Sequence, residues 1–95
     1  MPIVIEEWEW DDANLNECGR HGLTPKRVRQ VAEEAPRFRP NKAGRASTHQ
    51  MMGPDHGGEL WVVCILQILG KPGLWRAVTG WRANALETAW YRRRA

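Results

Sequence analysis

The apolar run from Leu60 to Leu69 constrains the fold of this chain more than any other feature of its sequence. All of its residues except Gln67 are apolar, and most of them favour strands. A strand without a polar face has to be covered on both sides, so the run predicts the central strand of a sheet. The 95 residues leave room for one modest core, and we expect a single domain spanning residues 1–95.

Glycine and proline signals divide the chain on either side of this run. Pro54 to Gly58 predicts a hairpin turn after a strand near Ala46 to Met52, and Gly70 to Gly73 predicts a second turn. The last strand then covers Leu74 to Arg82. Strict alternation along it places Arg76, Val78, Gly80 and Arg82 on one face and Trp75, Ala77, Thr79 and Trp81 on the other.

The beginning of the chain predicts one strand followed by a helix. Pro2 to Trp10 opens with β-branched residues and then alternates tryptophan with acids, which is typical of a strand with one buried face. Asp11 or Asp12 caps the helix that follows, and Gly22 supplies its stop. The apolar positions of this helix are Leu15 and Cys18.

Two further helices complete the predicted order of elements. Thr24 with Pro25 starts one helix, and Pro36 ends it. Arg37 to Gly58 is polar, so we expect no long regular element there apart from the strand near Ala46 to Met52. Asn84 and Glu87 form a variant of the capping box before a last helix with the apolar stripe Leu86, Ala89 and Trp90. The order β-α-α-β-β-β-α predicts an α+β fold with a small, antiparallel-rich sheet packed by helices.

Charge is divided unevenly along the chain. The first twelve residues carry five acids and no base, whereas residues 13–95 carry fourteen Lys and Arg against six acids. A small domain with such an excess of positive charge favours a polyanionic partner, RNA or DNA.

Several classes of protein are disfavoured by the composition. No apolar stretch is long enough to cross a membrane, and the acidic N-terminal segment does not resemble a signal peptide, so we expect a cytoplasmic protein. Cys18 and Cys64 lie far apart and are interpreted as small buried hydrophobic residues. The three histidines have no short His or Cys spacing, and we expect neither a metal nor another cofactor.

Short motifs follow one another in an order that is known from one protein family. They are Glu9-Trp10-Asp11 after the first strand, Arg20-His21-Gly22-Leu23 at the first helix end, and Trp81-Arg82 followed by Glu87 and Tyr91. Their order, over almost the whole chain, resembles the BrnT family of toxins, which are RelE-like ribonucleases of bacterial toxin–antitoxin pairs. The resemblance implies a RelE-like fold and RNA cleavage that inhibits translation and growth. It also implies an antitoxin partner encoded nearby, with DNA bound only as part of the toxin–antitoxin complex.

The chain departs from the family pattern at the end of its last strand. Gly80-Trp81-Arg82-Ala83 stands where the family has Ser-Ala-Arg followed by another base, and the loop from Leu66 to Trp75 is longer than usual. The missing base removes one expected phosphate contact, and Trp81 is large enough to reshape an RNA groove. These departures bear on the activity more than on the fold.

Metal-independent RNA cleavage requires deprotonation of the ribose 2′-OH, neutralisation of the phosphorane and protonation of the leaving 5′-oxygen. Arg82 is the first candidate for the phosphate clamp, because a planar guanidinium binds two phosphate oxygens at once. The alternative is a surface arginine paired with Glu87. His49 and His21 are the candidates for proton transfer, because imidazole titrates near neutral pH. His21 can equally be structural at its helix end, and His56 is expected to be solvated in its glycine turn.

Further bases and aromatic residues point to binding surfaces. Arg37, Arg39, Lys42 and Arg45 follow one another within nine residues and form either a track for a phosphate backbone or a merely solvated loop. Arg76, on the same predicted face as Arg82, completes the candidate RNA-binding set.

The six tryptophans are too many for so small a core to bury completely. We expect Trp8 and Trp10 at a protein interface, because the acids around them repel RNA. Arg92 and Arg93 near the end of the chain can stabilise the helix C-terminus through its dipole, bind RNA or contact an acidic antitoxin, and the sequence leaves these three roles open. They complete the candidate partner-binding set.

Three classes of function therefore compete. The first is an RNA-cleaving toxin. The second is a nucleic-acid-binding module without catalysis, which would use the same arginines and tolerate the loss of its histidines. The third is a degenerate toxin that only binds an antitoxin or regulates its operon.

Overall fold

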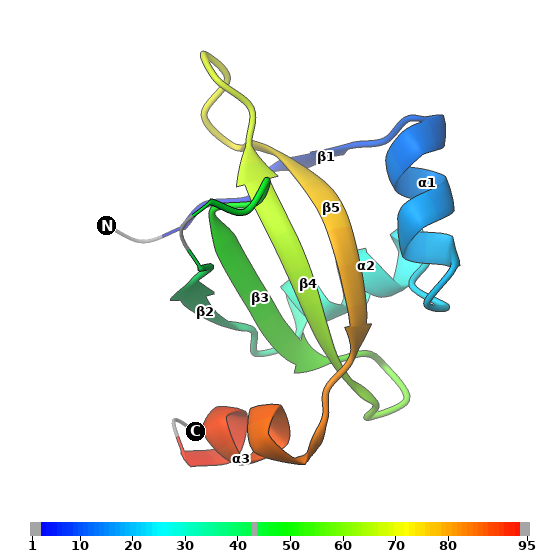
Figure 1. Ribbon diagram of the computed structural model, residues 1–95, viewed down its shortest axis with the longest axis vertical. Coiled ribbons are helices and arrows are strands. Elements are labelled where there is room, and N and C mark those ends of the chain that lie inside the picture. Colours follow the sequence, from blue (N-terminus) through cyan, green and yellow to red (C-terminus); the bar gives the residue numbers. More distant parts are fainter. Residues whose placement is uncertain (1–2, 43, 94–95) are drawn as a thin grey trace.

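The computed structural model describes residues 3–42 and 44–93, which form three helices and a five-stranded mixed sheet (Figure 1). The strand order in the sheet is β1-β5-β4-β3-β2. β1 runs parallel to β5, and the other neighbouring strands are antiparallel. The elements are β1 (Glu7–Glu9), α1 (Asp12–Gly19), α2 (Pro25–Glu33), β2 (Arg37–Pro40), β3 (His49–Pro54), β4 (Leu60–Gln67), β5 (Leu74–Arg82) and α3 (Ala85–Arg93). The predicted α+β class is confirmed.

The strand β4 has the central position that its apolar sequence predicts. It lies between β3 and β5, and residues 61–65 are all buried. The strand ends at Gln67, two residues before the end of the apolar run, because its pairing with β5 ends there. Leu69 lies in the following turn and is 98% exposed.

The N-terminal strand is shorter than predicted. Only Glu7–Glu9 pairs with another strand, and Pro2 lies outside the described residues. Pairing begins at Glu7 because its partner strand begins at Leu74. Ile3 and Ile5 have no regular secondary structure, but they pack against the core.

The helix α1 starts at a predicted cap, and Gly22 supplies its left-handed stop as predicted, because the Leu23 N–H beyond it donates back to the Cys18 carbonyl. Asp11 forms a reciprocal capping box with Asn14, and the helix ends at Gly19. Gly22 lies in the turn beyond it, with a φ of 81° that favours glycine. Leu15 is 40% exposed, contrary to its predicted place on the apolar side.

The helix α2 agrees with the sequence at its start. The Thr24 side chain accepts a hydrogen bond from the Arg27 N–H, as an N-cap does. The helix ends at Glu33, before Pro36. Val28 and Val31 are buried, as the helical spacing predicts.

The polar segment after α2 contains a strand that the sequence pattern does not reveal. β2 has only four residues, carries two arginines and ends in Pro40. It pairs with β3 alone, and an edge strand tolerates both charge and proline. β3 itself covers His49–Pro54 instead of Ala46 to Met52. The hairpin turn after it lies within one residue of its predicted place, and there the Asp55 N–H donates to the Glu59 carbonyl.

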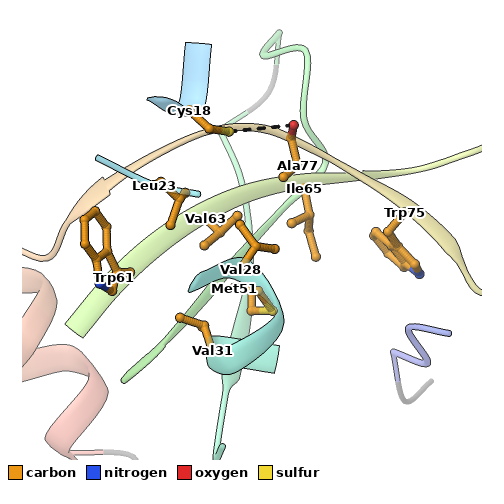
Figure 2. Packing of buried hydrophobic residues seen from close by; sticks show 10 residues of the cluster. All are labelled: Cys18, Leu23, Val28, Val31, Met51, Trp61, Val63, Ile65, Trp75 and Ala77. Carbon is orange, nitrogen blue, oxygen red and sulfur yellow. Dashed lines mark hydrogen bonds between the residues drawn. The ribbon is translucent and has the colours of Figure 1, made fainter. Parts of the chain in front are cut away.

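The helix α2 packs on one face of the sheet, and α1 lies beside the outer edge of β5 (Figure 1) and joins the same apolar core through Cys18 (Figure 2). Gly80 permits this close packing, because an added Cβ would overlap the Leu23 side chain and lie 2.7 Å from the Val62 carbonyl oxygen. Cys18 and Cys64 are both buried and unbridged, as predicted. The buried apolar cluster consists of Cys18, Leu23, Val28, Val31, Met51, Trp61, Val63, Ile65, Trp75 and Ala77.

A β-bulge in β5 overturns the alternation predicted for that strand. The pairing of β4 with β5 skips Val78, which shifts the side chains after it to the opposite face. The residues on the helix-covered face are Trp75, Ala77, Gly80 and Arg82. Thr79 and Trp81, predicted on the same face as Trp75, lie on the opposite one. The strand's bounds are as predicted, but the faces of its last four residues are the reverse.

The helix α3 lies beyond the ends of the central strands, in the lower part of Figure 1. Asn84 and Glu87 cap it reciprocally, with both hydrogen bonds 2.8 Å long, as predicted. Leu86 is 83% exposed, so the predicted apolar stripe does not face the core. The helix is attached instead by Trp90, which lies under the Arg39 guanidinium, and by the Tyr91 hydroxyl, which donates to the Ala35 carbonyl.

Asn14 joins three elements from a buried position. Its Nδ2 donates to the carbonyls of Glu9 and Ala77, at 2.9 and 3.0 Å, and its Oδ1 accepts from the Asp11 N–H at 2.7 Å. The single amide thus links the end of β1, the start of α1 and the middle of β5. A buried polar side chain with all these partners fixes the position of α1 against the sheet.

We expect Asn14→Ala to lower the free energy of unfolding by about 2–4 kcal/mol, because it removes the amide that donates to the buried Ala77 carbonyl and the part-buried Glu9 carbonyl, and with it one half of the capping box. Urea denaturation followed by tryptophan fluorescence measures this loss. Asn16→Ala, on the exposed side of the same helix, is the matched control and should change stability by less than about 0.5 kcal/mol. Equal losses in the two variants would show that the amide of Asn14 has no special role.

Candidate functional site

A cavity of about 460 Å³ opens on the sheet face opposite α1 and α2. Gln50, Cys64 and Thr79, paired across β3, β4 and β5, lie at its floor. The connection from β2 to β3 forms one wall, and β5 with the start of α3 forms the other. We call it the basic cavity, and its lining consists of Arg39, Asn41, Lys42, Arg45, Ala46, Ser47, Gln50, Cys64, Val78, Thr79, Trp81 and Glu87.

Three bases of the predicted RNA-binding set line this cavity: Arg39, Lys42 and Arg45. Lys42 and Arg45 are exposed, and neither forms an ion pair with any residue that the structure describes. Because no carboxylate neutralises them, their charge is available to an anionic ligand.

The wall formed by β2 and β3 is held by a chain of side-chain hydrogen bonds. The Arg39 Nε donates to the Gln50 Oε1 at 2.8 Å, and the Gln50 Nε2 donates to the Asn41 Oδ1 at 3.1 Å. The Asn41 Nδ2 then donates to the Ser47 Oγ at 2.6 Å. This network orients the Arg39 guanidinium before any ligand binds.

The opposite wall carries a carboxylate beside an indole. The Trp81 Nε1 donates to both Glu87 oxygens, at 3.1 and 3.2 Å, and the Asn84 N–H donates to Oε1 at 2.8 Å. These donors hold Glu87 in one orientation at the rim of the basic cavity.

The Cys64 thiol lies at the floor between these two walls. Burial raises the pKa of the thiol, while a hydrogen bond with Ser47 opposes that rise. The negative charge of Glu87 also raises the pKa, and the positive charges of Arg45 and Arg39 lower it. The thiol thus lies within the electrostatic influence of charged groups from both walls.

The two other predicted RNA-binding residues lie outside the basic cavity. Arg37 is half-buried on β2, two residues before Arg39 and on the same face of the strand. Arg76 donates to the Asp11 carboxylate through two nitrogens, at 2.8 Å each, and to Glu9 at 3.2 Å. The acidic N-terminal segment thus neutralises Arg76, whose pKa is raised by the hydrogen bond with Asp11.

Arg82 lies on the other face of the sheet from the basic cavity. Its guanidinium carbon is 5.7 Å from the centre of the Trp61 ring, and the Arg27 guanidinium carbon is 5.3 Å from the same centre. The Trp61 Nε1 donates to the buried Asp55, which also lies 3.6 Å from the Arg27 Nε. Arg82 does not pair with Glu87, so that alternative does not hold.

The predicted catalytic residues Arg82, His49 and His21 are not joined by any contact among the described residues. His49 contacts Thr48 and Trp75. On β4, His49 pairs with Ile65 and Arg82 pairs with Trp61, and these two positions are four residues, or about 13 Å, apart along the strand. His21 lies 3.5 Å from the Glu17 carboxylate, which accepts a hydrogen bond from Thr79. The structure therefore does not assemble these three residues into one site.

The predicted partner-binding residues lie in two places. Trp8 and Trp10 are partly buried and pack against the apolar core, so most of their surface is already used. Arg92 and Arg93 are exposed at the end of α3. Among the described residues, no group of three or more His, Cys, Asp or Glu side chains is placed to hold a metal ion, and no helix is long and apolar enough to cross a membrane.

Comparison with known proteins adds no relative. No protein-family model matches the chain, and a search of curated proteins finds no match.

Sequence reasoning missed part of the cavity lining. Gln50, Asn41 and Ser47 are polar residues in a polar segment, and nothing in the pattern distinguishes them from solvated loop residues. The sequence marks Glu87 as a helix cap, as an alternative partner for Arg82 and as part of the motif that resembles the BrnT family, but it does not place Glu87 in a cavity. One signal was available, because the capping box places Glu87 directly after the strand end that carries Trp81.

The ion pair of Asp11 with Arg76 predicts a specific pH dependence. Hydrogen bonds from Arg76 lower the pKa of Asp11 from its ordinary value of 3.8 to about 2, so its stabilising effect is complete above 3.8 and disappears as the pH falls towards 2. We expect Asp11→Asn, which keeps a side-chain cap, to be less stable than the wild type at pH 6. This difference should close between about pH 4 and pH 2.

Urea midpoints measured across this pH range test the expectation. Asp12→Asn, at a neighbouring carboxylate without an ion pair among the described residues, is the control and should show a smaller difference. If the difference in urea midpoint between the wild type and Asp11→Asn does not change with pH, the ion pair of Asp11 with Arg76 does not contribute to stability as expected.

Proposed function

We propose that this protein is a ribonuclease toxin of the RelE-like class that binds RNA in the basic cavity. The observation that carries the proposal is the gathering of Arg39, Lys42 and Arg45 around a hollow on the sheet face that α1 and α2 leave uncovered. Phosphates supply most of the affinity in protein–nucleic acid binding, and unpaired bases enter cavities that a duplex cannot.

The distribution of charge supports RNA as the ligand. The acidic segment at the N-terminus pairs with Arg76, so it reduces the positive charge at the β1 edge and leaves the bases of the cavity without carboxylate partners other than Glu87. Lys42 and Arg45 thus remain free to attract an anionic ligand to the cavity. The Trp81 ring in the wall offers an aromatic surface for an unpaired base.

The order of elements supports the RelE-like class. The observed elements follow the order β-α-α-β-β-β-α that the BrnT resemblance implies, with the edge strand β2 added after α2. Under this proposal the partner is an antitoxin, which would shield the basic cavity and meet the exposed Arg92 and Arg93 at the end of α3.

A second candidate function is RNA binding without cleavage, as in a degenerate toxin that only binds its antitoxin and RNA. One observation favours it: none of the described residues lining the basic cavity is a histidine. The cavity would then hold RNA without the imidazole that proton transfer ordinarily uses.

Binding is tested with a variant that carries Arg39→Gln, Lys42→Gln and Arg45→Gln together. We expect it to bind a fluorescent single-stranded RNA at least tenfold more weakly, measured by anisotropy. The slope of log affinity against log salt should flatten by about 2, because each phosphate contact on a single strand contributes about 0.7. The matched control removes three exposed bases outside the cavity, with Lys26→Gln and Arg29→Gln on α2 and Lys71→Gln in the turn after β4. Equal weakening in both variants would refute a localised site.

Activity in cells separates the two faces of the sheet. On induced expression in a bacterial host, we expect the wild type and Arg82→Ala to arrest growth and degrade RNA, and Arg45→Ala to do neither. Arg82 contributes a cation–π contact worth about 0.5–1 kcal/mol, so its loss should leave the protein folded. The reverse outcome would move the phosphate clamp to Arg82, as the sequence alone suggested. Normal growth with the wild type would favour binding without cleavage.

A further inference from the structure

Glu87 is the one carboxylate among the described residues that line the basic cavity. Its Oε1 accepts from the Asn84 N–H, and both oxygens share the Trp81 indole N–H. Among the described contacts, Oε2 accepts only from that indole, so it retains a free lone pair. A fixed carboxylate with acceptor capacity, facing a wall of three bases, has the geometry of a general base beside a phosphate clamp.

We propose that Glu87 is the general base of the cleavage reaction, which rests on the ribonuclease function proposed above. The Glu87 carboxylate takes the proton of the ribose 2′-OH, and the 2′-oxygen forms a bond to phosphorus. The bond from phosphorus to the 5′-oxygen breaks, and the departing oxygen takes a proton from solvent water. The products are a 2′,3′-cyclic phosphate and a 5′-hydroxyl, after which the protonated Glu87 returns its proton to solvent.

The positions of the three basic residues agree with a phosphate clamp opposite Glu87. Arg45 and Lys42 lie on the wall opposite Glu87 and are free to contact the non-bridging phosphate oxygens, while Arg39 is held in place by Gln50. Glu87, Arg45 and Arg39 all line the cavity that has Cys64 at its floor. A scissile phosphate bound in this cavity would have cations on one side and the base on the other.

The histidines are less suited to the role. His49 lies against Trp75, and His21 lies beside Glu17, so neither belongs to the lining of the basic cavity. A base has to reach the proton that it removes.

The substitution Glu87→Gln tests the assignment directly. Glutamine retains an oxygen for the Asn84 N–H and the Trp81 indole, and it is the other residue that a capping box accepts, so the fold should persist. It cannot act as the base. We expect cleavage of a single-stranded RNA to fall at least 100-fold, while RNA binding stays equal or becomes tighter because a negative charge is lost.

A control variant separates the loss of the base from the loss of a charge. Glu33→Gln makes the same change of charge at an exposed position on α2 and should cleave like the wild type. If Glu87→Gln fails to fold, Glu87→Asp takes its place, because it keeps the negative charge but withdraws the carboxylate by one methylene group. We then expect cleavage to fall at least tenfold while RNA binding is unchanged, and a wild-type cleavage rate overturns the assignment.

The outcomes distinguish this inference from the function on which it rests. Loss of cleavage with intact binding in Glu87→Gln, together with 2′,3′-cyclic phosphate ends from the wild type, supports the assignment. Wild-type cleavage rates in Glu87→Gln overturn it and leave the ribonuclease function standing. A wild-type protein that binds RNA but does not cut it overturns both the base and the nuclease, and one that binds no RNA overturns the proposed function as a whole.

Discussion

The unequal covering of the two faces of the sheet is the constraint on which the rest of this structure depends. β4 is apolar on both faces, so both have to be removed from water, yet α1 and α2 cover only one of them. On the other face Met52 and Val62 are buried next to Trp81, whereas farther along the same strands the polar Gln50 lies beside Cys64. The basic cavity lies beside Gln50 and Cys64, on the part of the sheet that α1 and α2 do not cover.

The bulge at Val78 decides which side chains reach that cavity. By adding one residue to β5, it places Thr79 and Trp81 on the cavity face and sends Arg82 to the helix-covered face, where it stacks on Trp61. Gly80 then faces Leu23, at a point where a larger residue would not fit. Because of this one irregularity, Trp81 and not Arg82 lies in the cavity wall, and the chemistry that the wall can offer is different.

Electrostatics adds a second level of organisation. The excess of positive charge is not spread evenly, because Arg76 is paired with Asp11 and Glu9, Arg27 lies beside Asp55, and Arg20 is bound to Glu17. Among the described bases without an ion pair, Arg39, Lys42 and Arg45 lie together around the cavity, whereas the others are spread over α2, β2, the turn after β4, the end of β5 and α3. Ion pairs at a surface contribute little to stability, but they determine where free charge stays and hence where a polyanion is attracted.

Part of this could be predicted from the sequence, and the reasons are local. The central place of β4 follows from its apolar run, the helix starts at Asp11 and Thr24 from capping chemistry, and the bounds of β5 from its flanking turns. The sequence does not predict β2, because four residues that include two arginines and a proline show no strand periodicity. The sequence identifies Arg39, Lys42 and Arg45 as a group because they are neighbours in the chain. It does not show that they lie across a cavity from Glu87 and Trp81, which are more than 35 residues away in the sequence.

The sequence by itself determined the elements whose signals act over a few residues: the strands with apolar runs, the helix caps, the turns and the segregation of acid from base. The tertiary structure decided which residues share a face and a cavity. The pairing register with its bulge, the parallel pairing of β1 with β5 and the amide of Asn14 that fixes α1 depend on contacts between segments up to 67 residues apart, as Glu7 and Leu74 are. Those contacts are selected by the packing of the whole core, which no local pattern encodes.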